Sequence, residues 1–454
     1  MAETVCLITP PSAFLVDQRV FVSLGILRVA AVLDEVEHLD LNGVEDFARV
    51  AGEHARRSQA YAFGITATTP QMPSVVAIVR EIRKARPEAR IVLGGPHATL
   101  VNAAAKRGVQ RAQDALEQLH ALVDVVVAGD GEKAIHAALK PSASKLIDAD
   151  DPKGHFWVGN QDALPLPRRE LVDLKSYRYE IDGVRATSMI AQLGCPFECA
   201  FCGGRYSPSL RKIRTRSTDH VVEEVRELAK SFGGIMMYDD ELNVNRGLVD
   251  LMRKIEPFGL KLRGFVKSEL FTDEQAEAMK RAGFSWILVG FESGSPRILQ
   301  NINKKATVED NDRCMEIAHR HGLKVKALMS IGHAGESAET VEETKRWLLR
   351  VRPDDFDCTI ISTYPGTPYY DDAVDGTYTA PKTGDRLHSR NIDFLEVSEF
   401  YKGIPGQYHA YVWTDHLSCD DIVRLRDQLE DEVRTKLGIP YYKPVPFEAS
   451  MGQR

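Results

Sequence analysis

The sequence of 454 residues lacks a long apolar stretch, an excess of basic residues and an obvious set of paired cysteines. No apolar run approaches the roughly 20 residues that a helix needs to cross a bilayer, so we expect no membrane partner. The formal net charge of -7 gives no reason to expect nucleic-acid binding. Seven cysteines are an odd number, and four of them are scattered: Cys6, Cys314, Cys358 and Cys419. This usage predicts no disulfide framework and a reducing, cytoplasmic location.

The other three cysteines lie in one short stretch. Cys195, Cys199 and Cys202 follow the spacing Cys-x3-Cys-x2-Cys. Three thiolates in one loop can hold three irons of a [4Fe–4S] cluster and leave the fourth iron open to a small molecule. A zinc site usually has four ligands, and no second Cys-x2-Cys pair or nearby histidine completes such a set. The spacing therefore predicts an open-site iron–sulfur cluster, with a chance loop or an incomplete zinc knuckle as the alternative.

Strands alternate with helices over the first 140 residues. Short apolar runs predict strands at residues 5–9, 36–41, 60–66, 91–93 and 124–128, and helical periodicity lies between them, with one helix expected over 102–122. This order predicts a doubly wound parallel sheet, in which ligands bind at the carboxyl ends of the strands. Polar residues and glycines collect at those ends: Thr66, Thr68, Thr69, Gly94, Gly95, Gly129, Gly131 and Glu132. The dinucleotide fingerprint Gly-x-Gly-x-x-Gly is absent after the first strand.

A second strand–helix repeat follows a predicted linker at residues 141–184. Six further strands are expected at 185–192, 234–238, 261–266, 286–289, 324–329 and 359–362, which predicts a partial (β/α)6 barrel over residues 185–375. The chemistry of such barrels lies on the loops that follow the strands. Polar side chains gather in those loops: Asp239, Asp240, Glu241, Lys267, Glu292 and Ser330.

The cysteine spacing, with Phe201 just before the third cysteine, resembles that of the radical S-adenosylmethionine (SAM) enzymes. In that family the open iron is chelated by the amino and carboxylate groups of SAM, and reductive cleavage of SAM gives a 5′-deoxyadenosyl radical. The aromatic residue lies near the adenine. The resemblance implies a [4Fe–4S] cluster on the three cysteines, SAM as a cofactor, and an external electron donor of the flavodoxin or ferredoxin type.

The barrel loops extend this resemblance. Residues 239–241 replace the family's Gly-Gly-Glu segment near the SAM amino group, and Glu292 would contact the amino group or the ribose. Lys267 stands where many relatives have arginine near the SAM carboxylate, and Ser330 is grouped with these cofactor-binding residues. A cationic amine favours carboxylate partners and a carboxylate favours a cation. The alternative is that the acidic residues are solvated loop charges or helix N-caps. His333 stands where proline or leucine is common.

Three short motifs of the N-terminal region resemble the cobalamin-binding domain that precedes the radical SAM domain in one large subgroup. They are Pro10-Pro11 after the first strand, Gly94-Gly95-Pro96-His97 after the fourth and Gly129-Asp130-Gly131-Glu132 after the fifth. In that subgroup the glycines leave room for the nucleotide tail of cobalamin, and hydroxyl residues after the third strand bond to it. The resemblance gives these roles to the polar residues and glycines named above. A helper domain that has lost its ligand is the alternative.

One expected histidine is absent. Many cobalamin proteins carry Asp-x-His-x-x-Gly after the first strand, and its histidine ligates cobalt from below. Here the loop from Ser12 to Arg19 contains no histidine. If cobalamin binds, we expect its lower face to be open, occupied by water or covered by a side chain that does not ligate cobalt.

The barrel pattern stops near residue 375. Residues 376–454 are predicted to form a small α-rich segment with a helix over 420–437 and an aromatic stretch that includes Phe394, Phe400 and Tyr401. This segment is placed to cap the barrel mouth and shape a substrate pocket, or it merely docks the tail, since aromatic residues also dominate ordinary cores.

The leading hypothesis is a cobalamin-dependent radical SAM methyltransferase. The resemblance implies that a methyl group moves from SAM via methylcobalamin to a carbon of a small-molecule or peptide substrate. An enzyme with both cofactors that forms rings or rearranges its substrate without methyl transfer is one alternative. A non-catalytic electron-transfer or cofactor-carrier protein is the other, although a simple electron carrier needs neither an open iron nor a barrel.

Overall fold

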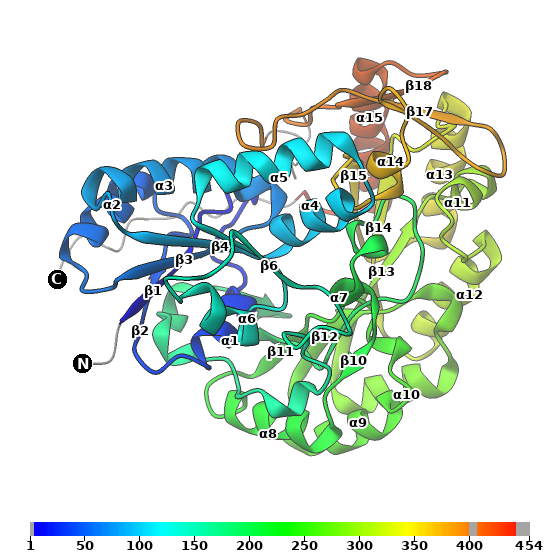
Figure 1. Cartoon of the computed structure of the whole chain (residues 1–454). Helices are drawn as coiled ribbons and strands as arrows, with labels where there is room; N and C mark the ends of the chain where they lie inside the picture. The colour runs from blue at the N-terminus through cyan, green and yellow to red at the C-terminus, as the bar shows by residue number, and fades with distance from the viewer. Residues whose placement is uncertain (1–3, 399–405, 442–454) are drawn as a thin grey trace.

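The computed structural model describes residues 4–398 and 406–441. A parallel sheet with helices on both faces lies beside a strongly curved sheet that is backed by helices on its outer side (Figure 1). No helix within the described residues is both long enough and apolar enough to span a membrane.

The N-terminal sheet has six parallel strands in the order β2-β1-β3-β4-β5-β6, which confirms the doubly wound, Rossmann-like prediction. The strands are β1 (Val5–Thr9), β2 (Val36–Asp40), β3 (Ala62–Thr66), β4 (Arg90–Gly94), β5 (Val125–Gly129) and β6 (Leu146–Ala149). The last strand corrects the sequence analysis, which placed residues 141–184 in a linker. Strand β6 pairs with β5 at the sheet edge, where Asp148 forms an ion pair with Lys106 at 2.8 Å. Strand β6 is short and is paired on one side only, so it need not be apolar throughout. Its sequence therefore resembles that of a loop.

Six helices flank this sheet: α1 (Leu24–Ala30), α2 (Phe47–Arg57), α3 (Met72–Ala85), α4 (Pro96–Lys106), α5 (Gln110–Leu122) and α6 (Gly131–Ala138). Helices α1 and α6 cover one face, and α2 and α3 cover the other (Figure 1). The single helix expected over 102–122 is two helices. Gly108 separates them with a φ of 81°, a conformation that few residues other than glycine adopt readily.

The second sheet confirms the partial barrel of six parallel strands, in the order β15-β14-β13-β12-β11-β8, with the short β7 (Glu180–Ile181) antiparallel to β8. Its strands are β8 (Val184–Met189), β11 (Gly234–Met237), β12 (Lys261–Phe265), β13 (Phe284–Glu292), β14 (Lys324–Ile331) and β15 (Asp355–Ile360). Strand β15 begins four residues earlier than predicted. Its polar residues Asp355 and Asp357 pair with Lys326 of β14 at 3.0 and 2.8 Å, so charged side chains occupy a strand position.

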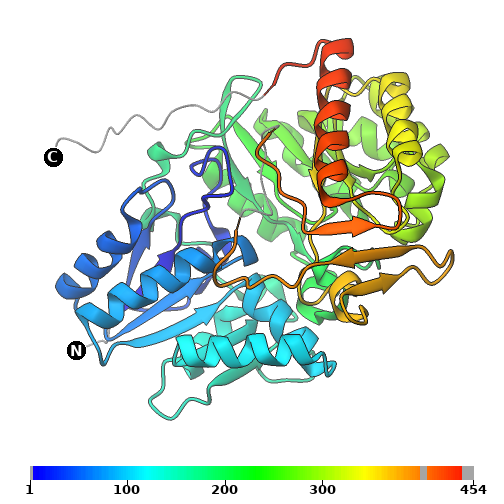
Figure 2. The same ribbon diagram turned by 90° about the horizontal axis from the view of Figure 1, so that it is seen from above.

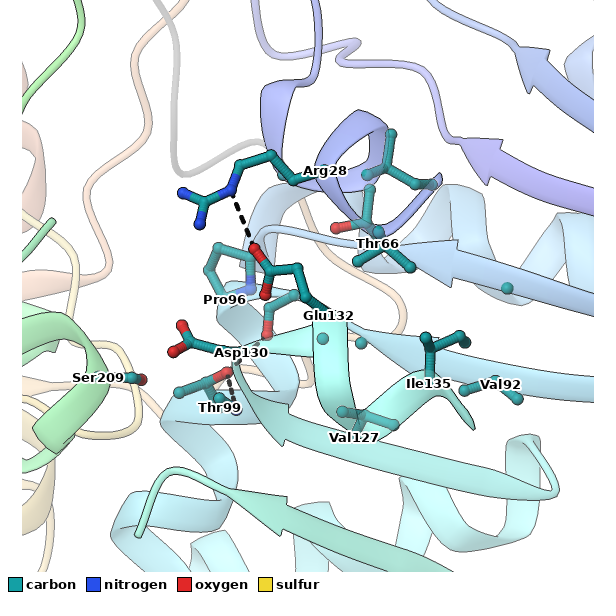
Figure 3. A pocket seen from close by; sticks show the side chains of 18 of the residues that line it. Arg28, Thr66, Val92, Pro96, Thr99, Val127, Asp130, Glu132, Ile135 and Ser209 are labelled. Carbon is teal, nitrogen blue, oxygen red and sulfur yellow. Dashed lines mark hydrogen bonds and ion pairs between the residues drawn. The ribbon is translucent and has the colours of Figure 1, made fainter. Parts of the chain in front are cut away.

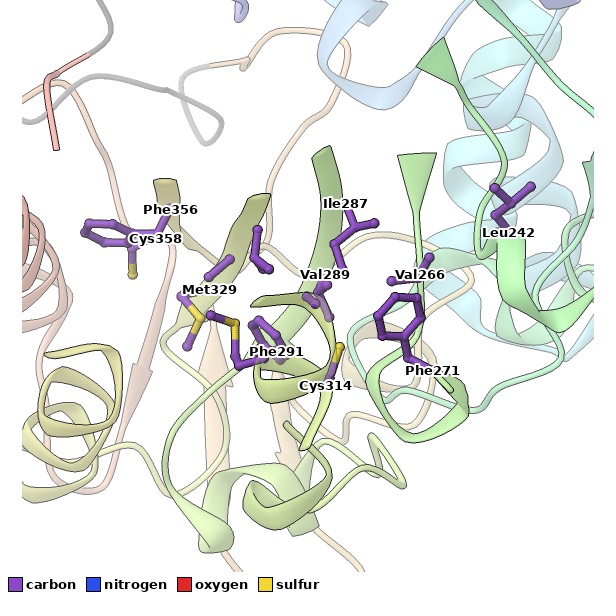
Figure 4. Close-up of a cluster of buried hydrophobic side chains, with 14 of the residues drawn as sticks. Leu242, Val266, Phe271, Ile287, Val289, Phe291, Cys314, Met329, Phe356 and Cys358 are labelled. Carbon is purple, nitrogen blue, oxygen red and sulfur yellow. The ribbon is translucent and has the colours of Figure 1, made fainter. Parts of the chain in front are cut away.

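The outer helices of the barrel are α8 (Thr218–Leu228), α9 (Leu248–Ile255), α10 (Asp273–Ala282), α11 (Pro296–Asn301), α12 (Val308–Arg320) and α13 (Ala338–Val351). Between the barrel and these helices lies a large apolar core. Figure 4 shows Cys314 and Cys358 among its apolar side chains, and both are almost completely buried. These two cysteines therefore pack as small apolar residues, as their scattered positions suggest.

The C-terminal segment contains more than the predicted helix. After α14 (Pro368–Asp371) come three short antiparallel strands, β16 (Thr377–Thr379), β17 (Arg386–Ser389) and β18 (Val412–Thr414), and then α15 (Cys419–Leu437). The strands have only three or four residues each and give no clear period in the sequence. In the aromatic stretch, the ring of Phe394 lies 6.2 Å from that of His97 at the start of α4, whereas Phe400 and Tyr401 lie outside the described residues.

Helix α15 packs against α13 and against β15, the edge strand of the barrel (Figure 2). Arg426 donates to the carbonyl oxygen of Cys358 at 2.7 Å, and Arg434 donates to that of Phe356 at 2.5 Å. The carboxylate of Glu430, almost completely buried, lies between the two arginines and pairs with both. The helix thus covers the edge strand β15 of the half-barrel.

Candidate functional site

A cavity of about 260 Å³ lies between the N-terminal sheet and helices α1 and α6 (Figure 3). Apolar side chains from the strands and both helices gather at one end: Leu7, Ile26, Val29, Val92, Val127 and Ile135. Polar residues gather at the other end: Arg28, Thr66, Thr99, Asp130 and Glu132. The barrel side adds Ser209 together with the apolar residues Ile190, Leu193 and Leu210. The cavity can therefore hold a largely apolar group that carries polar substituents.

The charges at the polar end are already paired within the chain. Glu132 forms an ion pair with Arg28 at 3.0 Å, and burial raises the pKa of this carboxyl (Figure 3). Asp130 pairs with Arg214 of β10 (Arg214–Thr215), which lies beside the cysteine loop. Thr99 accepts a hydrogen bond from the Gly129 amide at 2.9 Å and donates one to the Gly95 carbonyl oxygen at 2.9 Å. The polar end is thus rigid and holds little net charge.

The structure brings six of the eight N-terminal residues singled out from the sequence to this cavity. They are Thr66, Gly94, Gly95, Gly129, Gly131 and Glu132. Thr68 and Thr69 do not line it. Thr68 forms a capping box with Gln71, and the Thr69 hydroxyl lies 3.1 Å from Nδ1 of His97. These two hydroxyls form hydrogen bonds within the protein and do not line the cavity. Arg28 and Thr99 line the cavity but gave no signal in the sequence.

Among Gly94, Gly95 and Gly129, only Gly94 is explained by free space. A Cβ atom on Gly95 would lie 2.6 Å from the Thr66 hydroxyl, and one on Gly129 would lie 2.5 Å from the backbone of Ala149. Both residues also have a φ of 90° or more. Gly94 differs, because its Cβ would meet nothing closer than the Val127 carbonyl oxygen at 3.8 Å. A larger side chain at 94 would therefore enter the cavity, whereas the other two positions need glycine for the backbone itself.

The cysteine loop follows β8 and is closed by the β9–β10 hairpin, with β9 at Gln192–Leu193. The Cys195 amide donates to the Leu210 carbonyl oxygen at 3.0 Å, and the Ala200 amide donates to that of Ile302 at 2.8 Å. Gly194 has a φ of 92°, and a Cβ there would collide with the Lys212 carbonyl oxygen. The loop is therefore held from both the hairpin and the barrel.

Two of the carboxylates expected near SAM support this loop directly. Asp239 accepts hydrogen bonds from the amides of Ala191 and Gln192 at 3.1 and 2.6 Å, and Asp240 accepts one from the Gly194 amide at 3.0 Å. Asp239 is almost completely buried, and burial raises its pKa to about 7. Its contacts make it a residue that positions the loop.

The three cysteines fit an iron–sulfur cluster better than a single metal ion. Burial raises the pKa of Cys195 to about 12, so a thiolate at this position requires a positive partner. Among the described residues, the three sulfur atoms do not form a group within 4.8 Å of one another, the spacing that marks ligands of one ion. Ligands that each bind a different iron need no closer approach, so this arrangement is compatible with the predicted cluster.

A hydrogen-bonded network lies beside the loop. Glu292, at the end of β13, contacts Lys304 Nζ through Oε1 at 3.1 Å and accepts a hydrogen bond from the Ser330 hydroxyl through Oε2 at 2.7 Å. Ser330 lies 2.8 Å from Nε2 of His333, whose Nδ1 lies 3.2 Å from the Tyr369 hydroxyl. Burial lowers the pKa of His333 to about 4, so this imidazole is neutral.

Phe201 joins this network to the cysteine loop, because its ring lies 5.4 Å from that of His333. The Tyr369 amide also donates to the Ala200 carbonyl oxygen at 3.1 Å. The role of Lys304 cannot be read from the sequence, because its partner Glu292 lies on another loop. Phe201, Glu292 and Ser330 thus belong to one connected group of side chains beside the cysteine loop, and their contact with SAM stays a prediction.

Lys267 was expected near the SAM carboxylate and Glu241 near the SAM amino group, and their surroundings differ. The ammonium group of Lys267 is almost completely buried, lies 2.8 Å from the Glu269 carboxylate and donates to the Lys304 carbonyl oxygen at 2.9 Å. It is therefore not placed as a free cation for a SAM carboxylate. Burial raises the pKa of Glu241 to about 7, although Lys304 and Lys267 partly offset this effect. Glu241 remains a candidate partner for a cationic amine.

Helix α4 links the cavity to the cysteine loop. It begins at Pro96 in the cavity wall, and Leu100 of its second turn packs against Gly203, the residue after Cys202. A Cβ atom on Gly203 would lie 3.0 Å from Leu100 Cδ2. The two sites therefore share one short helix and face the same interface between the two sheets (Figure 1).

Two family models match the two parts of this arrangement. Residues 18–139 match the B12 binding domain, and residues 189–348 match the Radical SAM superfamily. The chain is a radical SAM enzyme that carries a cobalamin-binding domain. Its cofactors are a [4Fe–4S] cluster, SAM and cobalamin. The three-cysteine loop and the cavity at the carboxyl ends of the N-terminal strands have the chemistry that these groups need.

Three relatives show how far the sequence similarity extends. The chain is 28% identical over 329 residues to an uncharacterized methyltransferase of Pyrococcus horikoshii, covering 68% of this chain and 69% of that protein. It is 26% identical over 340 residues to the anaerobic magnesium-protoporphyrin IX monomethyl ester cyclase of Cereibacter sphaeroides, covering 68% and 53%. It is 23% identical over 313 residues to the hopanoid C-3 methylase of Methylococcus capsulatus, covering 65% and 57%. The chain thus spans little more than half the length of the second and third.

Solved structures share the whole architecture. TsrM, a radical SAM methyltransferase from Kitasatospora setae with cobalamin and a [4Fe–4S] cluster bound, matches with a TM-score of 0.66 at 18% identity, over 98% of this chain and 92% of that chain. OxsB, a cobalamin-dependent radical SAM enzyme with aqua-cobalamin and SAM bound, matches with a TM-score of 0.60 at 16% identity, over 82% and 54%. At these identities the matches establish the fold.

Proposed function

We propose that this enzyme transfers a methyl group from SAM, by way of cobalamin, to a carbon of a small-molecule or peptide substrate. The observation that carries the proposal is the junction at α4, where the cavity wall at Pro96 and the cysteine loop at Gly203 meet through Leu100. A shared interface lets one substrate reach both cofactors, and such proximity favours a reaction that uses both. The methyltransferase names of relatives from Pyrococcus horikoshii and Kitasatospora setae support the choice of methyl transfer.

When bound, the cluster and SAM supply a hydrogen-abstracting radical and cobalamin carries the methyl group. The chain supplies the positioning. Cys195, Cys199 and Cys202 would ligate the cluster, Glu241 and the network of Glu292 and Ser330 would hold the SAM amino group and ribose, and Phe201 would contact the adenine. Thr66 and the cavity beside Gly94 would receive the nucleotide tail of cobalamin. We assign Asp239, Asp240 and Lys267 a supporting role because their described contacts lie within the chain.

The remaining parts of the proposal concern partners. Reductive cleavage of SAM requires one electron, so we propose an external flavodoxin-like or ferredoxin-like donor in a reducing cytoplasm. The C-terminal segment, residues 376–454, would contribute to the substrate pocket. Its Val412 contacts the loop after β14, where a Cβ on Gly332 would lie 3.2 Å from Val412 Cγ2.

The test uses the reconstituted full-length protein with cobalamin, a chemical or flavodoxin reductant, candidate substrates and SAM that carries a deuterated methyl group. We expect the product to gain one deuterated methyl group, with one 5′-deoxyadenosine and one S-adenosylhomocysteine formed per transfer. The variant with alanine at all three loop cysteines is the matched control and should form none of the three.

Two other product patterns would contradict the proposal and indicate a different reaction. A product without an added methyl group, formed with 5′-deoxyadenosine but without matching S-adenosylhomocysteine, would assign the chain to ring formation or rearrangement, the activity named for its relative from Cereibacter sphaeroides. S-adenosylhomocysteine without 5′-deoxyadenosine would show polar methyl transfer to a nucleophilic carbon.

A further inference from the structure

Three potential metal ligands meet on the face of the N-terminal sheet opposite the cavity. Cys6 of β1 and Glu37 of β2 are register partners, and His54 lies on α2, which covers this face (Figure 1). Side chains alternate along a strand, so Leu7 lines the cavity while Cys6 points toward α2. One ligand atom from each of the three residues lies within 4.8 Å of the other two.

Nε2 of His54 is the atom at which the three groups meet. Nε2 of His54 lies 3.0 Å from Glu37 Oε2 and 3.4 Å from Cys6 Sγ. A ring nitrogen offers either one N–H or one lone pair. If this nitrogen carries the hydrogen, the ring can donate to the Glu37 carboxylate while the Cys6 thiol keeps its own hydrogen. With the lone pair, the thiol can donate to the nitrogen, but the carboxylate then faces a second lone pair. A cation between the three atoms could instead take all three as ligands.

Two of the three separations lie close to those between ligands of a tetrahedral zinc ion. With Zn–N and Zn–O near 2.0–2.2 Å and Zn–S near 2.3 Å, tetrahedral ligands lie about 3.4 Å (N to O) and about 3.6 Å (N to S) apart. The observed 3.0 and 3.4 Å are each slightly shorter, and a small outward movement of the three side chains would admit the ion. The approach to the group is open on one side, because the side chains of His54 and Glu37 are 30% and 34% exposed.

We propose that Cys6, Glu37 and His54 form a zinc site, with water as the fourth ligand. Thiolate, imidazole and carboxylate together favour Zn²⁺ over Mg²⁺ or Ca²⁺, which bind oxygen ligands. The Ser58 hydroxyl donates to Glu37 Oε2 at 2.8 Å and orients the carboxylate, as neighbouring groups do in known metal sites. A nucleophilic role for Cys6 would need substrate access, and this residue is completely buried.

The site would have a structural role that is separate from the reaction. A bound ion would tie β1 and β2 to α2, and β1 also carries Leu7, which lines the cavity on the opposite face. Because a ligand that binds only the folded state stabilises that state, Zn²⁺ should raise the Tm of the N-terminal domain. The inference does not depend on the proposed function, since it concerns the other face of the sheet.

The test measures metal content in the full-length protein with its iron–sulfur cluster and cobalamin in place, so that the loop cysteines are occupied. The protein is equilibrated with Zn²⁺, desalted, and analysed for zinc and iron by mass spectrometry. We expect one zinc per chain beside the cluster iron. Cys6→Ala and His54→Gln should each lower the zinc content at least tenfold and leave iron and cobalamin unchanged. Cys314→Ala, at another buried cysteine, is the matched control and should keep its zinc.

Two further measurements distinguish loss of the zinc site from misfolding of a variant. Glu37→Gln changes a partly exposed side chain, so it should fold and yet lose the rise in Tm that Zn²⁺ gives the wild type. X-ray absorption at the zinc edge should show one sulfur ligand at about 2.3 Å and the rest nitrogen or oxygen at about 2.0–2.2 Å. The proposal fails if the wild type retains no zinc, if zinc persists in Cys6→Ala, or if the absorption shows two or more sulfur ligands, which would place the ion on the loop cysteines.

Discussion

Filling the cavity at Gly94 should weaken cobalamin binding without unfolding the chain. Gly94 has ordinary backbone angles and is the last residue of β4, and its Cβ would have no neighbour closer than 3.8 Å. A leucine side chain built there must extend into the cavity of about 260 Å³ and occupy part of the space that the nucleotide tail needs. Overfilling a packed space costs about 1–3 kcal/mol, which corresponds to roughly 5-fold to 150-fold weaker binding.

The assay is equilibrium binding of cobalamin to Gly94→Leu, followed by its visible absorption after gel filtration. Iron content and circular dichroism should match the wild type, since the cysteine loop lies in the other domain. Gly94→Ala is the graded control and should bind nearly normally, because its Cβ makes only ordinary contacts. Gly95→Ala should instead lower the stability of the domain, because a Cβ there would approach the Ala67 amide nitrogen to 2.8 Å. Wild-type affinity in Gly94→Leu would refute the placement of cobalamin in this cavity.

Three other predictions follow from the barrel. Alanine at all three loop cysteines should abolish binding of about four irons and leave the N-terminal domain folded, as measured by iron assay and circular dichroism. Lys304→Met should destabilise the barrel by about 3–5 kcal/mol, since it leaves Glu292 buried without its cation, whereas adding Glu292→Gln should recover most of this loss in denaturant unfolding. Burial raises the pKa of Glu336 to about 7, so the folded state holds this proton more tightly than the unfolded state. Stability should therefore fall as the pH rises from the ordinary glutamate pKa of 4.5 to about 7, and Glu336→Gln should remove that slope.

Sequence period and spacing predict much of the fold because buried parallel strands are continuous apolar runs. Most strands of both sheets follow this rule. The cysteine loop could be predicted as well, because its three cysteines lie close together in the sequence. The exceptions are elements held by particular partners. Strand β6 contains Asp148, which pairs with Lys106, and β15 begins with acidic residues that pair with Lys326. The three short C-terminal strands are stabilised by one another, which no local pattern records.

The site was predictable only where a motif is local. The sequence alone cannot show that Arg28 of α1 pairs with Glu132 of α6, because the two helices meet only in the folded sheet. The same holds for Lys304 and Glu292, which lie on different barrel loops. Thr68 illustrates the opposite error, since a hydroxyl after a strand is as useful for capping the next helix turn as for binding a ligand.

The contact of α15 with β15 has a consequence for how the chain can be shortened. An exposed edge strand presents free carbonyl oxygens to which other chains can add, which favours aggregation. Arg426 and Arg434 bind two of these oxygens, those of Cys358 and Phe356, and so make the edge unavailable for intermolecular pairing. A chain cut at residue 375 would contain every barrel strand and yet expose this edge. We expect it to precipitate on expression, whereas a chain that extends through Leu437 should remain dispersed.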